Sequence, residues 1–440
     1  APATVTSPLP NTEQAFDWKN CWYPVTFVQD LPKNRLYSFS LYDEPFVLFR
    51  NQDEKLACLT DRCPHRAAKL SDGQIIDGKI ECSYHGWQFD TDGKCLHIPQ
   101  LPSDAKIPAT ACVQSFTVIE RQGMVWMWRG EPETADDERI PTIDDLDKPG
   151  FVCSDYMSDR PYDQTYFVEN VIDPAHFPIS HHGSLSDRSK AQPLEMEVLE
   201  TSVEGIQGRV RETKNANENW TNVDFVAPNL VKYRFEPIPG FSGGAVIYSL
   251  PLGKGRCRAL LRNYQNFSTR KVKLVPRWLD HLFRNRVSEE DMPFIRGQQA
   301  HIERLGTNPN SLYLPLKTSD TLLIEYRKWL DKYGSSLPFY QGYFTSKPHV
   351  PSDEGTPPSM LVERLRRHTE ICSSCNRAYQ VTNRLKQGSV GVAIALGALA
   401  IVTDHSWYQL VAISLSLSAV ALAVIAQIVK TKFERSYQRH

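Results

Sequence analysis

Short apolar runs alternate with turn residues over residues 13–135, a pattern that is typical of a small all-β domain. Phe46-Val-Leu-Phe49 and Met124-Val-Trp-Met-Trp128 are two of these runs, and Asp90-Thr-Asp-Gly93 has the composition of a hairpin turn. Residues 136–150 are acidic and polar, and we interpret them as a linker. The pattern therefore predicts a β-domain that ends near this linker.

Strand-like and helical patterns are mixed between about residues 151 and 350. Strand-like runs cover residues 195–211, 222–236 and 244–262, whereas residues 271–305 have the periodicity of a helix. This mixture predicts an α+β domain built on an antiparallel sheet.

Two apolar stretches follow, roughly Gly388–Val402 and Trp407–Val429, and residues 403–406 separate them. The second is long enough to cross a hydrocarbon core of ~30 Å, whereas the first is shorter by about a turn. A membrane hairpin is the simplest interpretation. The alternative is a pair of buried core helices, but little of the nearby chain remains to bury them. Lys and Arg flank the hairpin and are absent from its loop, so both flanks are expected on the same side as the two preceding domains.

Composition narrows the class of protein. The net charge of −1 gives no electrostatic footprint for nucleic acid. Ten cysteines, four of them in short motifs with metal or redox spacing, favour a reducing compartment over a secreted disulfide framework. The expected organisation is a tail (1–15), a first domain (16–135), a second domain (136–345), a linker (346–386), two transmembrane helices (387–430) and a basic tail (431–440).

Two Cys-His pairs form the most specific motif in the chain. Cys63-Pro-His65 is followed after sixteen residues by Cys82-Ser-Tyr-His85. Two thiolates and two imidazoles fit a Rieske [2Fe–2S] cluster, with Cys63 and Cys82 on one iron and His65 and His85 on the other. Zinc also accepts two Cys and two His ligands. The pairing of one Cys with one His in each motif, inside a β-rich segment, favours the cluster.

A second pair of histidines, His176 and His181, lies in the α+β domain. On an unbroken helix this spacing would turn the two rings apart by about 140°. Pro178 lies between them and is expected to disturb the helix, so that both rings can converge. Taken alone, the pair is explained equally well as ordinary surface or core histidines. Beside a Rieske cluster, which needs an electron acceptor, a mononuclear Fe(II) held by two His and one carboxylate is favoured.

The carboxylate of such a site is expected from the second domain. Asp291 is the candidate, and Glu290 is the alternative. Ser288 and Asp291 also have the spacing of a helix-capping pair, which would explain them without a metal.

Several stretches resemble a known family. They are Asp61–Gly73, Tyr84–Phe89, Glu169–His176, Lys317–Trp329 and Cys372-Ser-Ser-Cys375 ahead of the apolar pair. The chain is similar to the chloroplast and cyanobacterial Rieske monooxygenases that include pheophorbide a oxygenase and the protochlorophyllide-associated and translocon-associated Rieske proteins. Residues 98–108 resemble the translocon-associated type of the inner envelope.

The resemblance implies a Rieske β-domain, a helix-grip catalytic domain and a C-terminal membrane hairpin. It also implies that Asp291 is the third iron ligand. Asp173 would be the acid that connects a Rieske histidine of a neighbouring subunit to an iron-binding histidine, within a head-to-tail homotrimer. The implied reaction uses electrons from reduced ferredoxin and O2 to oxygenate a chlorophyll-derived tetrapyrrole or a bilin.

The implied location is a chloroplast inner envelope, thylakoid or cyanobacterial membrane, with the catalytic body on the stromal or cytoplasmic side. Cys372 and Cys375 are a candidate redox pair that thioredoxin would reduce. A weak metal pair, or two unpaired thiols at a helix start, would explain these cysteines as well. The alternative function is a redox-sensing subunit of a membrane protein-import complex with little catalytic role.

Overall fold

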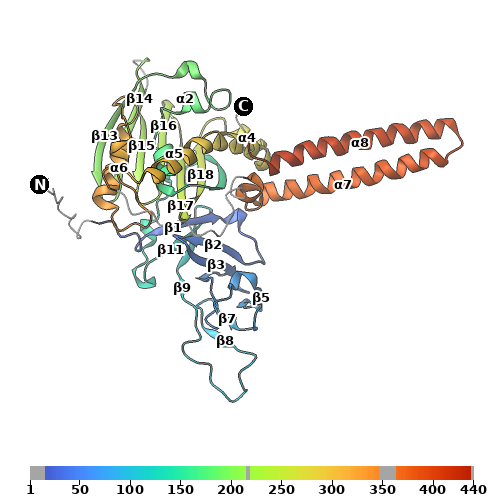
Figure 1. Ribbon diagram of the computed structural model, residues 1–440, viewed down its shortest axis with the longest axis horizontal. Helices are drawn as coiled ribbons and strands as arrows, with labels where there is room; N and C mark the ends of the chain where they lie inside the picture. Colours follow the sequence, from blue (N-terminus) through green and yellow to red (C-terminus); the bar gives the residue numbers. More distant parts are fainter. Residues whose placement is uncertain (1–14, 215–218, 346–362, 438–440) are drawn as a thin grey trace, which may run out of the picture. The chain divides into compact units, whose positions relative to one another are not determined.

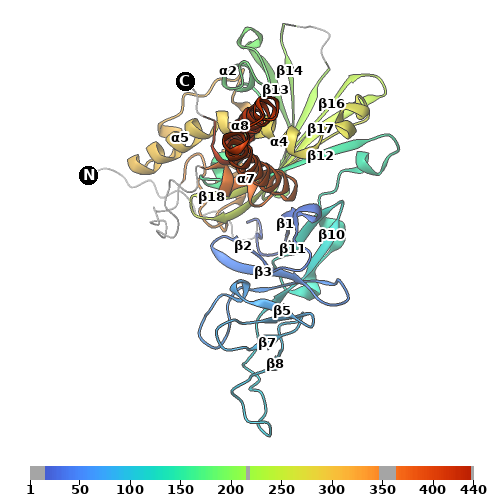
Figure 2. The same ribbon diagram turned by 90° about the vertical axis from the view of Figure 1, so that its right-hand side faces the viewer.

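The computed structural model describes residues 15–214, 219–345 and 363–437 (Figures 1 and 2). Two compact units divide the chain: the first comprises Ala1–Lys273 and Asp291–Glu354, and the second comprises Leu274–Glu290 and Gly355–His440. Most of the predicted tail 1–15, part of the predicted linker 346–386 and the last three residues of the predicted basic tail lie outside the described residues.

The N-terminal part of the first unit is built from three small antiparallel sheets. Their strands are β1 (Trp22–Phe27), β11 (Met124–Trp128) and β10 (Val118–Arg121); β2 (Tyr37–Leu41), β3 (Glu44–Arg50), β4 (Leu56–Thr60) and β9 (Ser115–Phe116); and β5 (Gln74–Ile76), β6 (Lys79–Glu81), β7 (Gln88–Phe89) and β8 (Cys95–His97). Phe49, Leu59, Ile80 and Phe89 form part of one buried core, as the alternation of apolar and polar residues predicts. The prediction of a small β-domain is confirmed.

One seven-stranded antiparallel sheet dominates the rest of the first unit, in the order β12-β18-β17-β16-β15-β14-β13. Its strands are β12 (Val152–Arg160), β13 (Leu194–Ser202), β14 (Gly205–Glu212), β15 (Thr221–Val226), β16 (Leu230–Ile238), β17 (Phe241–Gly253) and β18 (Arg256–Gln265). Each predicted strand-like run is therefore a hairpin. Gly205 shows why the first run turns: its φ is +141°, and a Cβ there would lie 2.0 Å from the carbonyl oxygen of Phe225.

The single helix predicted over residues 271–305 is wrong. Three helices occupy this stretch: α3 (Thr269–Leu274), α4 (Arg277–Glu290) and α5 (Met292–Leu305). Pro276 lies between α3 and α4. It separates the two helices because proline has no amide hydrogen to donate to a helical hydrogen bond. Pro293 lies in the first turn of α5, where proline is tolerated. The remaining long helix of the first unit, α6 (Thr321–Tyr333), packs against β13 and β14 (Figure 1).

In the second unit, α7 (Ser373–Val402) and α8 (Ser406–Glu434) run side by side (Figures 1 and 2). Both are long and apolar enough to cross a membrane. The first apolar stretch is shorter than the helix that carries it, which begins at Ser373, so residues ahead of Gly388 extend the candidate span.

The packing of this hairpin is unlike that of a soluble helical pair. Small side chains such as Ala393 and Ala419 are buried, and the Ser416 hydroxyl donates to the Ala393 carbonyl at 2.9 Å. Large apolar side chains face outward, with Ile394 69% and Ile401 83% exposed. Small residues between helices and large apolar residues outside are the arrangement found in lipid.

Candidate active site

Both Cys-His pairs lie on tight turns beside the second and third small sheets. The Cys63 carbonyl accepts from the Ala67 amide at 2.9 Å, and the Cys82 carbonyl accepts from the Gly86 amide at 2.9 Å. Ala67 and Gly86 both have positive φ, of 59° and 74°. These turns direct each Cys and its following His toward the other pair.

The four side chains converge as a [2Fe–2S] cluster requires. Cys63 and Cys82 are buried, and the rings of His65 and His85 have centroids 4.4 Å apart. His65 stacks on Trp87 with 4.7 Å between centroids. The buried Nδ1 of His65 has no hydrogen-bond partner among the described residues. A buried, unpartnered imidazole nitrogen fits a metal ligand, because burying it otherwise costs free energy.

The three predicted ligands of a mononuclear iron also meet. The Nε2 atoms of His176 and His181 lie 3.6 and 3.1 Å from Oδ2 of Asp291. One potential ligand atom from each residue lies within 4.8 Å of the others. Two imidazoles and one carboxylate on one side of a metal are the ligand set of non-haem iron oxygenases.

Pro178 was expected to break a longer helix, but it does not. It occupies the first turn of α2 (Phe177–Ser180), a one-turn helix, with His176 before it and His181 after it. The two histidines flank this single turn, and the chain leaves the helical conformation at His181, whose φ is −103° and ψ is 24°. Their ring centroids lie 5.4 Å apart. The prediction that they converge holds, for a different reason.

Asp291 precedes α5 but makes no capping hydrogen bond, so the capping explanation is wrong. Burial alone would raise the pKa of Asp291, but hydrogen bonds and charge from His176 and His181 hold it well below its usual range. The carboxylate is therefore ionised, as a metal ligand must be. The alternative ligand Glu290 instead pairs with Arg286 at 3.2 Å.

Asp173 lies behind His176. Its Oδ2 is 3.6 Å from Nδ1 of His176, and its Oδ1 accepts from the Ala175 amide at 2.7 Å. Burial opposes the charged form of His176, but its contacts with Asp173 and Asp291 raise the pKa of that imidazole to about 9. At 3.6 Å this contact is an ion pair and not a hydrogen bond, and Nδ1 of His176 has no hydrogen-bond partner among the described residues. A carboxylate beside the outer nitrogen is the arrangement that orients metal-binding histidines.

Comparison with known proteins agrees with this geometry. Residues 21–117 match the Rieske [2Fe–2S] domain, and residues 225–308 match pheophorbide a oxygenase. Protein TIC 55 of Pisum sativum is 35% identical over 96% of this chain and 82% of its own length. Pheophorbide a oxygenase of Arabidopsis thaliana is 32% identical over 93% of this chain and 81% of its own.

The chain belongs to this family of Rieske oxygenases. It is an oxygenase with a Rieske cluster and a mononuclear iron, and the predicted family, with its likeness to TIC 55, is confirmed. Among solved structures, dicamba monooxygenase bound to dicamba has a TM-score of 0.60 at 24% identity, covering 72% of this chain and 98% of that protein. This likeness supports the fold, whose predicted class is also confirmed.

A buried ionic network holds the helix that leads to the oxygenase's histidines. Glu169, on α1 (Gln164–Val171), accepts from Nε of Arg327 on α6 at 2.6 Å. Its other carboxylate oxygen accepts from Gln298 and Tyr313, each at 2.9 Å. Sequence reasoning assigned no role to this network. Glu169 and Arg327 did fall within the family-like stretches, which was the available signal.

The Rieske oxygenase has a cavity of about 610 Å³ beside α2, in the size range of small-molecule sites. Ala175, Phe177 and Pro178 line it, so its wall flanks His176. The opposite lining comes mainly from β13 to β16 and includes aromatic and charged side chains: Trp220, Tyr233, Phe235, Lys190, Arg211, Glu212 and Glu236.

The predicted redox pair lies in the second unit. Cys372 and Cys375 are buried, and neither forms a disulfide with a cysteine of the described residues. They lie beside His281 and His368, which sequence reasoning did not single out. The spacing His368-x₃-Cys372-x₂-Cys375 was a usable signal, but His281 is distant in sequence.

Proposed function

We propose that this oxygenase is a monooxygenase of a membrane-associated tetrapyrrole or bilin that carries a carboxylate. The observation that carries the proposal is the cavity of about 610 Å³ whose wall includes both neighbours of His176. Its apolar and aromatic lining suits a conjugated ring system. Lys190 supplies a cation and makes no ion pair within the described parts of the chain.

The aromatic wall of this cavity is held rigidly. Arg211 lies over the ring of Trp220, with 4.5 Å to its centroid, and donates from Nε to Glu195 at 2.7 Å. Arg209 also lies over this ring, with 4.2 Å to its centroid, so two cations hold the indole in place. This arrangement supports a planar or extended conjugated substrate.

The residues have distinct proposed roles. Cys63, His65, Cys82 and His85 hold the cluster, and His176, His181 and Asp291 hold the iron. The bound iron supplies the chemistry of dioxygen activation. Asp173 orients His176 and provides the polar contact through which a neighbouring subunit's cluster is connected, which requires a head-to-tail homotrimer. Tyr84, next to His85, is 61% exposed, which supports a docking surface at the cluster.

The hairpin of α7 and α8 is proposed to cross a chloroplast membrane. Its outward apolar side chains and small-residue interior support a lipid environment. The relatives TIC 55 and pheophorbide a oxygenase are named as chloroplastic. Lys430 and Lys432 lie in the last turns of α8, beyond its apolar stretch, so the flanks are expected on the stromal side.

Oxygen uptake by the detergent-solubilised chain tests the proposal. The assay uses reduced ferredoxin and a panel of pheophorbide a, protochlorophyllide and linear bilins, with mass spectrometry of the products. One panel member is expected to gain one oxygen atom per O2 consumed. Oxygen consumption without any oxygenated tetrapyrrole would contradict it and favour the redox-sensing subunit of a membrane complex.

A further inference from the structure

Four potential metal ligands are buried together at the base of the hairpin in the second unit. His281 lies on α4, His368 lies on the π-helical turn η9 (Leu365–Thr369), Cys372 precedes α7, and Cys375 lies in its first turn. All four side chains are fully buried. Two imidazoles and two thiols on three separate segments therefore meet in a place that water does not reach.

The distances among their ligand atoms are nearly uniform. Nδ1 of His281 lies 3.2 Å from Nε2 of His368, 3.4 Å from Sγ of Cys372 and 3.6 Å from Sγ of Cys375. Nε2 of His368 lies 3.2 Å from Sγ of Cys375. One atom from each residue lies within 4.8 Å of every other.

These separations are those of a tetrahedron around one ion. Zn–S bonds of about 2.3 Å and Zn–N bonds of about 2.0–2.1 Å give tetrahedral edges of about 3.3–3.8 Å. The measured edges of 3.2–3.6 Å fall at or close to that range. We propose that His281, His368, Cys372 and Cys375 bind a structural zinc ion, distinct from the two iron sites of the oxygenase.

The packing of this region explains why an ion is needed. Its apolar core contains only Phe433 and the two cysteines as fully buried members in the described part of the chain, with Trp278 and Tyr379 among the partly buried residues around them. Such a small core cannot by itself hold several segments together, and small domains are commonly stabilised by a metal. A closed site with four protein ligands is the structural type of zinc site.

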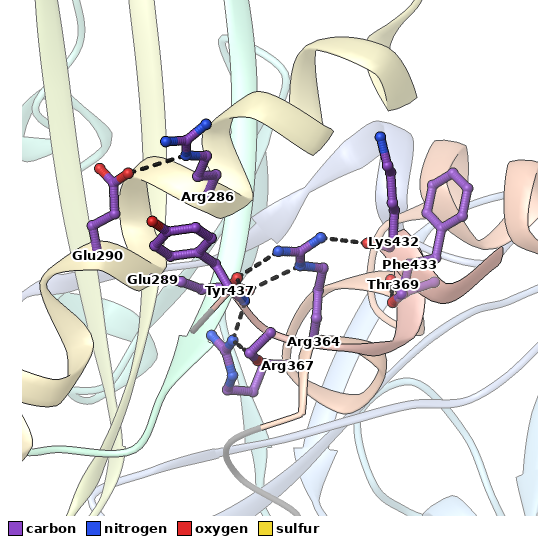
Figure 3. Close-up of polar contacts among 10 residues, drawn as sticks. Arg286, Glu289, Glu290, Arg364, Arg367, Thr369, Lys432, Phe433 and Tyr437 are labelled. Carbon is purple, nitrogen blue, oxygen red and sulfur yellow. Dashed lines mark hydrogen bonds and ion pairs between the residues drawn. The ribbon is translucent and has the colours of Figure 1, made fainter. Parts of the chain in front are cut away.

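The ligand-bearing segments are also fixed by charge (Figure 3). Glu289 on α4 accepts from Nε of Arg364, which directly precedes η9, at 2.9 Å and from Arg367, which lies within η9, at 2.9 Å. The Thr369 hydroxyl donates to the Phe433 carbonyl at 2.6 Å. These contacts fix the positions of α4, η9 and the end of α8 relative to one another. His281 and His368 therefore approach the cysteines from fixed directions.

A dithiol switch accounts for the two cysteines but not for the histidines. It requires Cys372 and Cys375 alone, and these two form no disulfide with each other. It gives no reason for two buried imidazoles to point at the same sulfur atoms. A zinc site uses all four groups.

Metal analysis of the full chain in detergent tests the proposal. By inductively coupled plasma mass spectrometry, the chain is expected to contain about one zinc in addition to about three irons. The double variant Cys372→Ser/Cys375→Ser should lose the zinc and keep the iron, whereas the exposed-cysteine variant Cys112→Ser should keep both. An unchanged Rieske absorption spectrum would show that the first unit of the double variant remains folded.

Cobalt substitution gives a second readout. Chain produced with Co²⁺ should show the visible absorption of tetrahedral cobalt bound to thiolate. His281→Ala should abolish this band, whereas His405→Ala, in the exposed hairpin loop, should retain it. Absence of zinc from the wild-type chain, a fourth iron in its place, or zinc that persists in the double cysteine variant would each overturn the proposal. A Cys372–Cys375 disulfide in the purified chain without bound zinc would overturn it in favour of the switch.

Discussion

Glu169 and Arg327 form a fully buried ion pair that joins α1 to α6, with 2.6 Å between Nε of Arg327 and Oε2 of Glu169. Arg327 also donates to the Gln341 carbonyl at 2.7 Å. α1 leads directly to Asp173 and His176, so this pair sets the position from which the iron site begins.

Arg327→Met is expected to destabilise the chain by about 3–5 kcal/mol, because it leaves the Glu169 carboxylate buried without its cation. The double variant Glu169→Gln/Arg327→Met should recover much of this loss, since no uncompensated charge remains. Denaturant unfolding followed by tryptophan fluorescence measures both. A single variant as stable as the double one would contradict the prediction.

Asp173→Asn is expected to keep both metal sites loaded. Turnover should fall by about tenfold to a hundredfold, because the amide cannot orient and polarise His176 as the carboxylate does. Iron content and coupled oxygen uptake test this. The matched control is Asp187→Asn: Asp187 lies 3.5 Å from His182 in an exposed Asp–His pair, and its loss should leave turnover unchanged. Full activity in the Asp173 variant would refute the bridging role.

Asp291→Ala is expected to lose the mononuclear iron and retain the cluster, so iron content should fall from about three to about two atoms per chain. The Rieske electron paramagnetic resonance signal should persist. Glu290→Gln is the neighbouring control and should keep all the iron, because Glu290 pairs with Arg286. Equal iron loss in the two variants would show that the change is not specific to the ligand.

Lys190→Met is expected to raise KM for a carboxylate-bearing substrate about two- to fivefold while leaving kcat unchanged, since an exposed ion pair contributes about 0.2–1 kcal/mol. The methyl ester of the same substrate should show no such difference. Lys214→Met, which alters an exposed lysine outside the cavity lining, is the control. An equal effect on acid and ester would argue against a carboxylate contact.

The sequence predicted features that depend on short-range patterns. The two Cys-His motifs and the His176/His181 pair are each local, and the structure brings their members together. The role of each residue stays a prediction. The helix over residues 271–305 was mispredicted because its apolar periodicity continues across both helix breaks, at Pro276 and at Asp291. Only Pro276 and Pro293 marked these interruptions in the sequence.

Long-range partners were not predictable in the same way. Glu169 and Arg327 are 158 residues apart, and His281 lies 91 residues before Cys372. No local pattern links such positions, because the fold alone decides which buried polar groups meet. His368 was the exception, since it lies close to both cysteines in the chain.

The break between α4 and α5 has a consequence for the spacing of residues along the chain. Glu290 is the last residue of α4 and Asp291 follows it directly, so no linker residue separates the helix that carries His281 and Glu289 from the carboxylate beside His176 and His181. An insertion or deletion at this junction would therefore displace Asp291 itself, so the length of the chain here is constrained from both sides.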